Sequence, residues 1–81
     1  MYVKRLQQLE GIARQHKFVE EAYAIQAGRE VRVVVDARKA DDAYAFQIAQ
    51  DIAKQVEKEM TFPGEIKVTV MREVRAEATA R

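Results

Sequence analysis

The sequence predicts an α+β fold in which two helices cover one face of a three-stranded mixed sheet. Apolar residues recur at helical spacing in residues 2–15 and 41–60. Residues 19–27, 30–36 and 65–72 are instead rich in Val and Ile or alternate apolar with polar side chains, as strands do. The order along the chain is therefore α-β-β-α-β. It corresponds to a two-layer sandwich with about half of a ferredoxin-like fold.

The first helix is expected over residues 2–15 and the second from Asp41-Asp42 to about Met60. Carboxylates at the start of the second helix can cap its free N–H groups and suit the positive end of its dipole. Pro63-Gly64 ends it and suits a type II turn, because proline disfavours a helical residue before it. The apolar stripes are Val3, Leu6, Leu9, Ile12 and Ala13 in the first helix, and Ala45, Ile48, Ala49, Ile52, Val56 and Met60 in the second.

The first two strands are expected to form a β-hairpin at Gly28. Glycine adopts positive φ without penalty, and Gly28-Arg29 suits the two central positions of a type II′ turn. In that register Ala24 faces Val33 across the hairpin. A three-residue loop would slip the pairing by one residue and exchange the two faces of the sheet. The sequence leaves this alternative open.

The third strand is expected to lie beside the first. A helical connection from the second strand to the third is most easily parallel and right-handed. We expect this crossover to give strand order 2-1-3, with the first strand in the centre and both helices on one face. Ile66, Val68 and Val70 of the third strand would then point inward, towards the helices.

The opposite face of the sheet has no predicted cover. It would carry apolar side chains with a basic component, and such patches on small domains commonly mark contacts with another domain or chain. A solvated sheet face with a few apolar residues is the alternative. The candidate interface residues are Tyr23, Ile25, Arg32, Val34, Lys67, Thr69 and Met71.

The composition offers little for catalysis. The chain has one histidine, His16, and neither cysteine nor serine. A Ser-His-Asp arrangement, a thiolate nucleophile and a metal site built from several histidines are therefore excluded. We expect no catalytic residue, no metal and no cofactor in this chain. The lack of cysteine fits a reducing cytoplasm, and no apolar run approaches the ~20 residues that cross a bilayer, so we expect no membrane contact.

The charges leave RNA binding as an alternative. Fourteen basic and thirteen acidic residues give a net charge of +1, so any nucleic-acid contact would need a local patch. Basic side chains on the hairpin and the last strand could form one. Glu30, Glu65 and Glu73 lie among them and favour ordinary surface pairing. The candidate RNA contacts are Arg29, Arg32, Lys67, Arg72 and Arg75.

Two long segments resemble a known family. Residues 23–33, with the sequence YAIQAGREVRV, and residues 63–76, with the sequence PGEIKVTVMREVRA, closely resemble the C-terminal end of bacterial ribonuclease Y. Residues 9–13 and 51–54 fit the same pattern, so the resemblance covers Val3 to Ala76. The sequence departs from the family before the first strand, at Lys17-Phe18-Val19, where a glycine is usual, and in the tail Glu77–Arg81.

The resemblance implies that residues 1–81 are a single accessory domain, a C-terminal fragment of a larger enzyme. Ribonuclease Y is an endoribonuclease that initiates messenger RNA decay. Its family has an anchor at the cytoplasmic side of the membrane, a coiled coil, a KH domain and an HD hydrolase domain that uses a divalent metal. The catalytic His-Asp motif has no counterpart here, because His16 is followed by Lys17.

Three hypotheses for function follow. The first is an accessory domain that forms a homo-oligomer or docks on the HD domain of the same protein, through the uncovered sheet face. The second is direct RNA binding through the basic residues. The third is a small ferredoxin-like regulatory dimerisation domain, of the kind found at the cytoplasmic end of cation transporters. The shortage of His and Cys disfavours metal sensing in that case.

Overall fold

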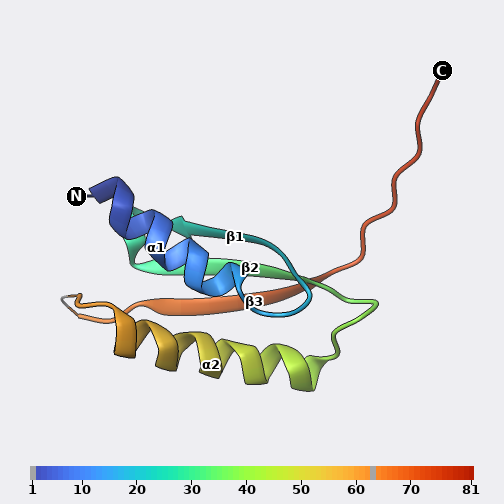
Figure 1. Ribbon diagram of the computed structural model, residues 1–81. Helices are drawn as coiled ribbons and strands as arrows, with labels where there is room; N and C mark the ends of the chain where they lie inside the picture. Colours follow the sequence, from blue (N-terminus) through green and yellow to red (C-terminus); the bar gives the residue numbers. More distant parts are fainter. Residues whose placement is uncertain (1, 63) are drawn as a thin grey trace.

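The computed structural model describes residues 2–62 and 64–81, and for Tyr2 and Val3 the backbone alone. Two helices and three strands follow one another in the predicted order, and α1 lies along β1 while α2 lies along β3 (Figure 1). This confirms the α+β fold class. The elements are α1 (Tyr2–Arg14), β1 (Val19–Ile25), the 3-10 turn η1 (Gln26–Gly28), β2 (Glu30–Asp36), α2 (Asp42–Glu59) and β3 (Lys67–Glu73).

The core lies between the two helices and one face of the sheet. Leu9 and Ile12 of α1 meet Ile48 and Ile52 of α2 over the valines of β2, and all are almost fully buried. Both helices therefore cover the same face, as predicted. The buried cluster is Leu9, Ile12, Ala13, Ala22, Val31, Val33, Val35, Ala40, Ile48, Ile52, Val56 and Met60.

The second helix begins as its sequence predicts. The Asp41 carboxylate accepts a hydrogen bond from the backbone N–H of Tyr44 at 2.8 Å and so caps α2. The helix runs to Glu59. The predicted turn at Pro63-Gly64 includes Pro63, which lies outside the described residues.

The strand order is β1-β2-β3, so the predicted order 2-1-3 is wrong. β2 pairs antiparallel with β1 and parallel with β3. Its valines are buried on both faces of the sheet, Val33 against the helices and Val34 on the other side. A near-continuous apolar run is typical of such a central strand, whereas β1 carries the exposed Glu20 and Glu21, which suit an edge. The rule for crossovers predicts a right-handed connection between β2 and β3. It does not decide whether β3 lies beside β1 or beside β2.

The hairpin turn also differs from the prediction. The chain turns through Gln26–Gly28, where φ is 53°, 58° and 84°, and Ala24 pairs with Val31. The predicted turn at Gly28-Arg29, with Ala24 opposite Val33, is therefore wrong by two residues. Side chains alternate with a period of two, so a shift of two leaves both faces of the sheet as predicted. Nothing in the sequence indicates the positive φ values of Gln26 and Ala27, because neither residue is a glycine.

Candidate functional site

The open face of the sheet brings the seven predicted interface residues together. They project from the side of the strands opposite the buried core, and the backbone register places Arg32 between Tyr23 of β1 and Thr69 of β3. Both described helices lie on the other side. The open face, as the name is used below, consists of Tyr23, Ile25, Glu30, Arg32, Val34, Lys67, Thr69 and Met71.

A polar cluster lies on the open face at the start of β2. Glu30 is only 6% exposed, and its carboxylate accepts hydrogen bonds from Thr69 Oγ1 at 2.9 Å and from Arg32 Nε at 3.3 Å. The Thr69 hydroxyl, followed by the bond and charge of Arg32 and the charge of Lys67, lowers the pKa of Glu30 against the opposing effect of burial. In the sequence, Glu30 stands out only as an acid among basic residues. The observed register places it between Ile25 and Lys67.

Apolar side chains surround this cluster with different degrees of exposure. Val34 is only 5% exposed although neither described helix covers it, while Ile25 and Met71 are half-buried. Tyr23 is 38% exposed at the β1 side. The open face therefore presents apolar side chains beside a polar cluster whose charges are already paired.

The structure does not gather the five predicted RNA contacts into one patch. Arg72 projects towards the helices, where it donates to the carbonyl oxygens of Ala40 at 2.8 Å and Ala37 at 3.1 Å and to Asp42 Oδ1 at 2.9 Å. Among the other four residues, Arg32 pairs with Glu30, Arg75 pairs with Glu73 at 2.8 Å and with Glu21 at 3.4 Å, and Arg29 and Lys67 are exposed.

The outer edge of β1 is occupied by side chains of α1. The backbone N–H of Ala24 donates to Glu10 Oε2 at 2.8 Å, and Arg14 Nη2 donates to the carbonyl oxygen of Ala22 at 2.8 Å. These groups point away from β2 and would otherwise be free to pair with another strand. The helix therefore closes this edge of the sheet.

The outer edge of β3 is bare. Lys67 N–H donates to the Arg29 carbonyl and the Glu73 carbonyl accepts from Ala37 N–H, each at 2.9 Å, so the backbone groups of odd-numbered residues point towards β2. Those of Val68, Val70 and Arg72 must then point outward. Within residues 2–62 and 64–81, no hydrogen bond satisfies these outward groups.

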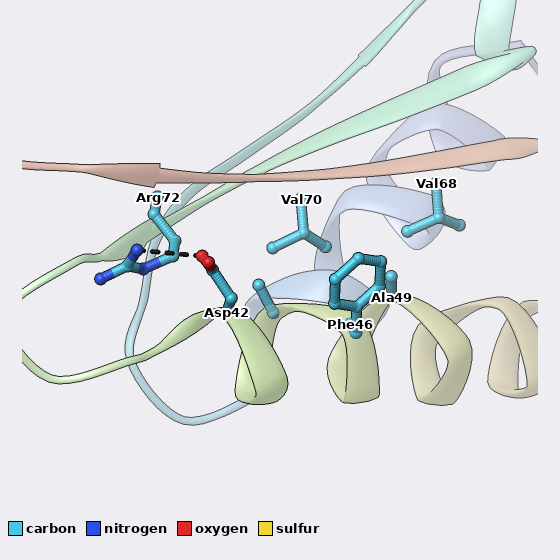
Figure 2. A pocket seen from close by; sticks show the side chains of 7 residues that line it. Asp42, Phe46, Ala49, Val68, Val70 and Arg72 are labelled. Atoms are coloured by element: carbon cyan, nitrogen blue, oxygen red, sulfur yellow. Dashed lines mark hydrogen bonds and ion pairs between the residues drawn. The ribbon is translucent and has the colours of Figure 1, made fainter.

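A groove of about 520 Å³ runs along this bare edge, between β3 and α2. Figure 2 shows Val68 and Val70 pointing from β3 towards α2, with the Phe46 ring between the two elements. Phe46 is 74% exposed. Phe46 is not among the predicted site residues, although it is an aromatic side chain outside the apolar stripe of the second helix, and that is the signal the sequence offers. The lining residues are Asp42, Ala45, Phe46, Ala49, Val68, Val70 and Arg72.

Groups suited to metal binding do not converge in the described part of the chain. No set of three or more His, Asp or Glu side chains there could hold a metal ion. The Nε2 atom of His16 lies 3.1 Å from Gln55 Oε1, and this contact links the end of α1 to α2. The described helices are also too short or too polar to cross a membrane.

Comparison with curated proteins finds relatives over nearly the whole chain. Ribonuclease Y of Thermotoga petrophila is 55% identical over 80 residues, which are 99% of this chain and 16% of that protein. Ribonuclease Y of Fervidobacterium nodosum is 52% identical, with the same coverage. Ribonuclease Y of Lactobacillus gasseri is 55% identical, with 99% of this chain and 15% of the relative covered.

The chain thus spans about one sixth of the length of these relatives. No family model matches the chain, and no solved structure matches it. The predicted resemblance is nevertheless confirmed: over nearly its whole length, this chain is similar to the C-terminal region of ribonuclease Y.

Proposed function

We propose that this chain is a non-catalytic accessory domain of a ribonuclease Y-like endoribonuclease and that it docks, through the open face, on the catalytic part of the same enzyme. The observation that carries this proposal is the open face itself. Its apolar residues, the exposed Tyr23 and the half-buried Ile25 and Met71, lie beside a polar cluster whose hydrogen bonds are already made.

The mixed character of the open face suits an interface between domains of one chain. Such interfaces typically bury about 600–1,500 Å² and are more polar than obligate interfaces between subunits. Tethering raises the effective concentration of a linked domain to about the millimolar range, so a modest surface is enough. The curated relatives are about six times as long as this chain, so each has a remainder on which such a domain could dock.

The polar cluster lowers the cost of covering the face. A buried carboxylate without partners would oppose docking strongly, but Glu30 is already paired with Arg32 and Thr69. The Arg32 side chain is still 44% exposed and has guanidinium N–H groups left to donate. It can therefore supply a directional contact to an acceptor on the docked surface.

Direct RNA binding has less support. Arg32, Arg72 and Arg75 all make ion pairs within the chain, and Arg72 lies on the opposite side of the sheet from Lys67. A phosphate backbone would have to displace those partners. Self-association through the open face remains the outcome to distinguish by experiment.

The test titrates the isolated chain with the remainder of Thermotoga petrophila ribonuclease Y, expressed without its matching 80 residues, and follows amide signals by NMR. We expect signals on the open face to move and those of α2 to stay. Tyr23→Asp should weaken binding at least about tenfold, because it places a carboxylate in an apolar contact. This site is chosen because Tyr23 is 38% exposed in the folded chain, whereas Asp at Ile25 would face Glu30 across the strands.

The matched control is Gln8→Asp, on the exposed side of α1. It should leave the affinity within about twofold of the original. If the two variants weaken binding equally, or if no binding occurs up to about 1 mM, the docking proposal is wrong. Salt-dependent binding of a single-stranded RNA, lost on changing Arg29 and Lys67, would instead establish the RNA alternative.

A further inference from the structure

The sheet is one strand narrower than its two helices. An α-helix with its side chains is about 10 Å wide, so two side by side span about 20 Å. Three strands at about 4.8 Å each occupy only about 14 Å, which leaves about one strand spacing of the helix layer without a strand beneath it. Glu10 and Arg14 hold α1 over the outer edge of β1, and α2 therefore overhangs the bare edge of β3. The groove beneath α2 lies where a fourth strand would lie.

We propose that residues 74–81 of a second copy of this chain occupy this groove as a fourth strand, antiparallel to β3. The reciprocal contact gives a dimer with two-fold symmetry, in which each copy supplies one tail and one groove. This surface is distinct from the open face, so the inference goes beyond the proposed docking on the enzyme.

The tail has the sequence pattern of a strand with one covered face. Val74, Ala76, Ala78 and Ala80 alternate with polar residues at a period of two. Alanine side chains are small enough to lie beneath an overhanging helix. In the monomer the tail leaves β3 as an extended segment (Figure 1), and Val74 is 66% exposed.

The backbone of β3 restricts how the tail can pair. Its even-numbered residues direct their N–H and C=O groups outward, and a tail that continues the strand does the same at its own even-numbered positions. If the two-fold axis of the dimer passes through Val74, Val70 lies opposite Ala78 of the second copy. The neighbouring pairs are Val68 with Ala80 and Arg72 with Ala76 of the second copy, so three alanines lie beneath α2.

The charges on the other face of the sheet favour this register. Glu73 lies opposite Arg75 of the second copy, which repeats across the dimer the ion pair these residues make at 2.8 Å within one chain. Thr69 lies opposite Thr79 of the second copy. Moving the two-fold axis to residue 73 would set Glu73 opposite Glu73 of the second copy. Moving it to residue 75 would set Arg75 opposite Arg75 of the second copy. The remaining like-charged pair, Lys67 with Arg81, falls at the last residue of the tail.

The size of α2 excludes direct pairing of β3 with β3. An axis through Val70 would set the two α2 helices side by side over adjacent strands, in less space than two helices need. Asp42, the first residue of α2, pairs with Arg72, two residues before Val74, and the helix runs from there along β3 away from Val74, to Val56 beside Ile66. With the axis through Val74, the two copies of α2 therefore extend away from the axis in opposite directions. The helices then clear one another, and each covers the other copy's tail.

The test measures the solution mass of the chain by sedimentation equilibrium from about 10 μM to about 1 mM. We expect a monomer–dimer equilibrium. Ala78→Glu should raise the dissociation constant at least about tenfold, because it places a carboxylate beneath α2. Thr79→Glu is the comparison, because it places a carboxylate at the next position, on the side of the strand that α2 does not cover. It should raise the constant clearly less than Ala78→Glu does, and both residues are exposed in the monomer.

A mixing experiment tests the exchange of tails directly. Phe46→Asp disables the groove at a residue that is 74% exposed, whereas Ala78→Glu disables the tail. The two variants, mixed where each alone is a monomer, should form a heterodimer with one intact contact. A monomer at all concentrations, or equal effects of Ala78→Glu and Thr79→Glu, would overturn the inference. A dimer that resists Ala78→Glu and is dissociated by Tyr23→Asp would overturn it too, by assigning self-association to the open face.

Discussion

The two outer strands of this sheet end in different ways. The edge of β1 is closed by Glu10 and Arg14, which reach over from α1 and bond to its backbone. The edge of β3 has no such partner among the described residues, because the residues of α2 nearest to it include Ala45, Phe46 and Ala49, which have no side-chain hydrogen-bonding groups. An edge strand is thus closed or left open by the residues of the helix above it. The strand's own sequence does not decide this.

The largest test of this contrast compares an apolar residue from each helix. Leu9→Ala should lower the free energy of unfolding by about 2–5 kcal/mol, because Leu9 is 1% exposed and its loss leaves a cavity. Phe46→Ala should cost less than about 0.5 kcal/mol, because Phe46 is 74% exposed and packs over a bare edge. Urea unfolding at low micromolar concentration, where a dimer would dissociate, measures both values. Equal losses would mean that Phe46 belongs to the core and that the groove is not open.

A smaller effect is expected at the closed edge itself. Glu10→Ala removes the acceptor for the Ala24 N–H and should cost about 1–2 kcal/mol, because a partly buried donor loses its charged partner. Hydrogen exchange at the Ala24 amide should also become faster. Glu20→Ala, on the exposed side of the same strand, is the control and should change stability by less than about 0.5 kcal/mol. Unchanged exchange at Ala24 would show that α1 does not close this edge.

Much of the fold could be predicted because side-chain periodicity determines which face of an element is buried. The two faces of the hairpin were assigned correctly even though Ala24 pairs with Val31 and not with Val33, since a slip of two residues preserves them. The turn itself could not be predicted, because Gln26 and Ala27 adopt positive φ without any glycine to indicate it. The strand order could be predicted better from the run Val33-Val34-Val35 of β2, which is typical of a central strand.

The candidate site could also be predicted only in part. Alternation alone placed Tyr23, Ile25 and Met71 on one uncovered face. β3 is an outer strand both in the predicted order 2-1-3 and in the observed order β1-β2-β3. That its edge is bare was not predictable, because it depends on which side chains of α2 lie over it. Glu30 was overlooked because its partner Thr69 is 39 residues away in the sequence.

The smallest effect concerns Glu30, which lies on β2 between the two edges. Its pKa in the folded chain is below the ordinary value of 4.5, first through the Thr69 hydroxyl and then through Arg32. Ionised Glu30 therefore stabilises the fold fully above pH 4.5, and this contribution is lost as the pH falls through the lower folded pKa. Thr69→Val should raise the pKa of Glu30 towards 4.5, as measured by carboxyl NMR, and should reduce the loss of stability on acidification below pH 4.5. An unchanged titration would mean that the hydroxyl does not hold this carboxylate, and that the open face is not a preformed surface.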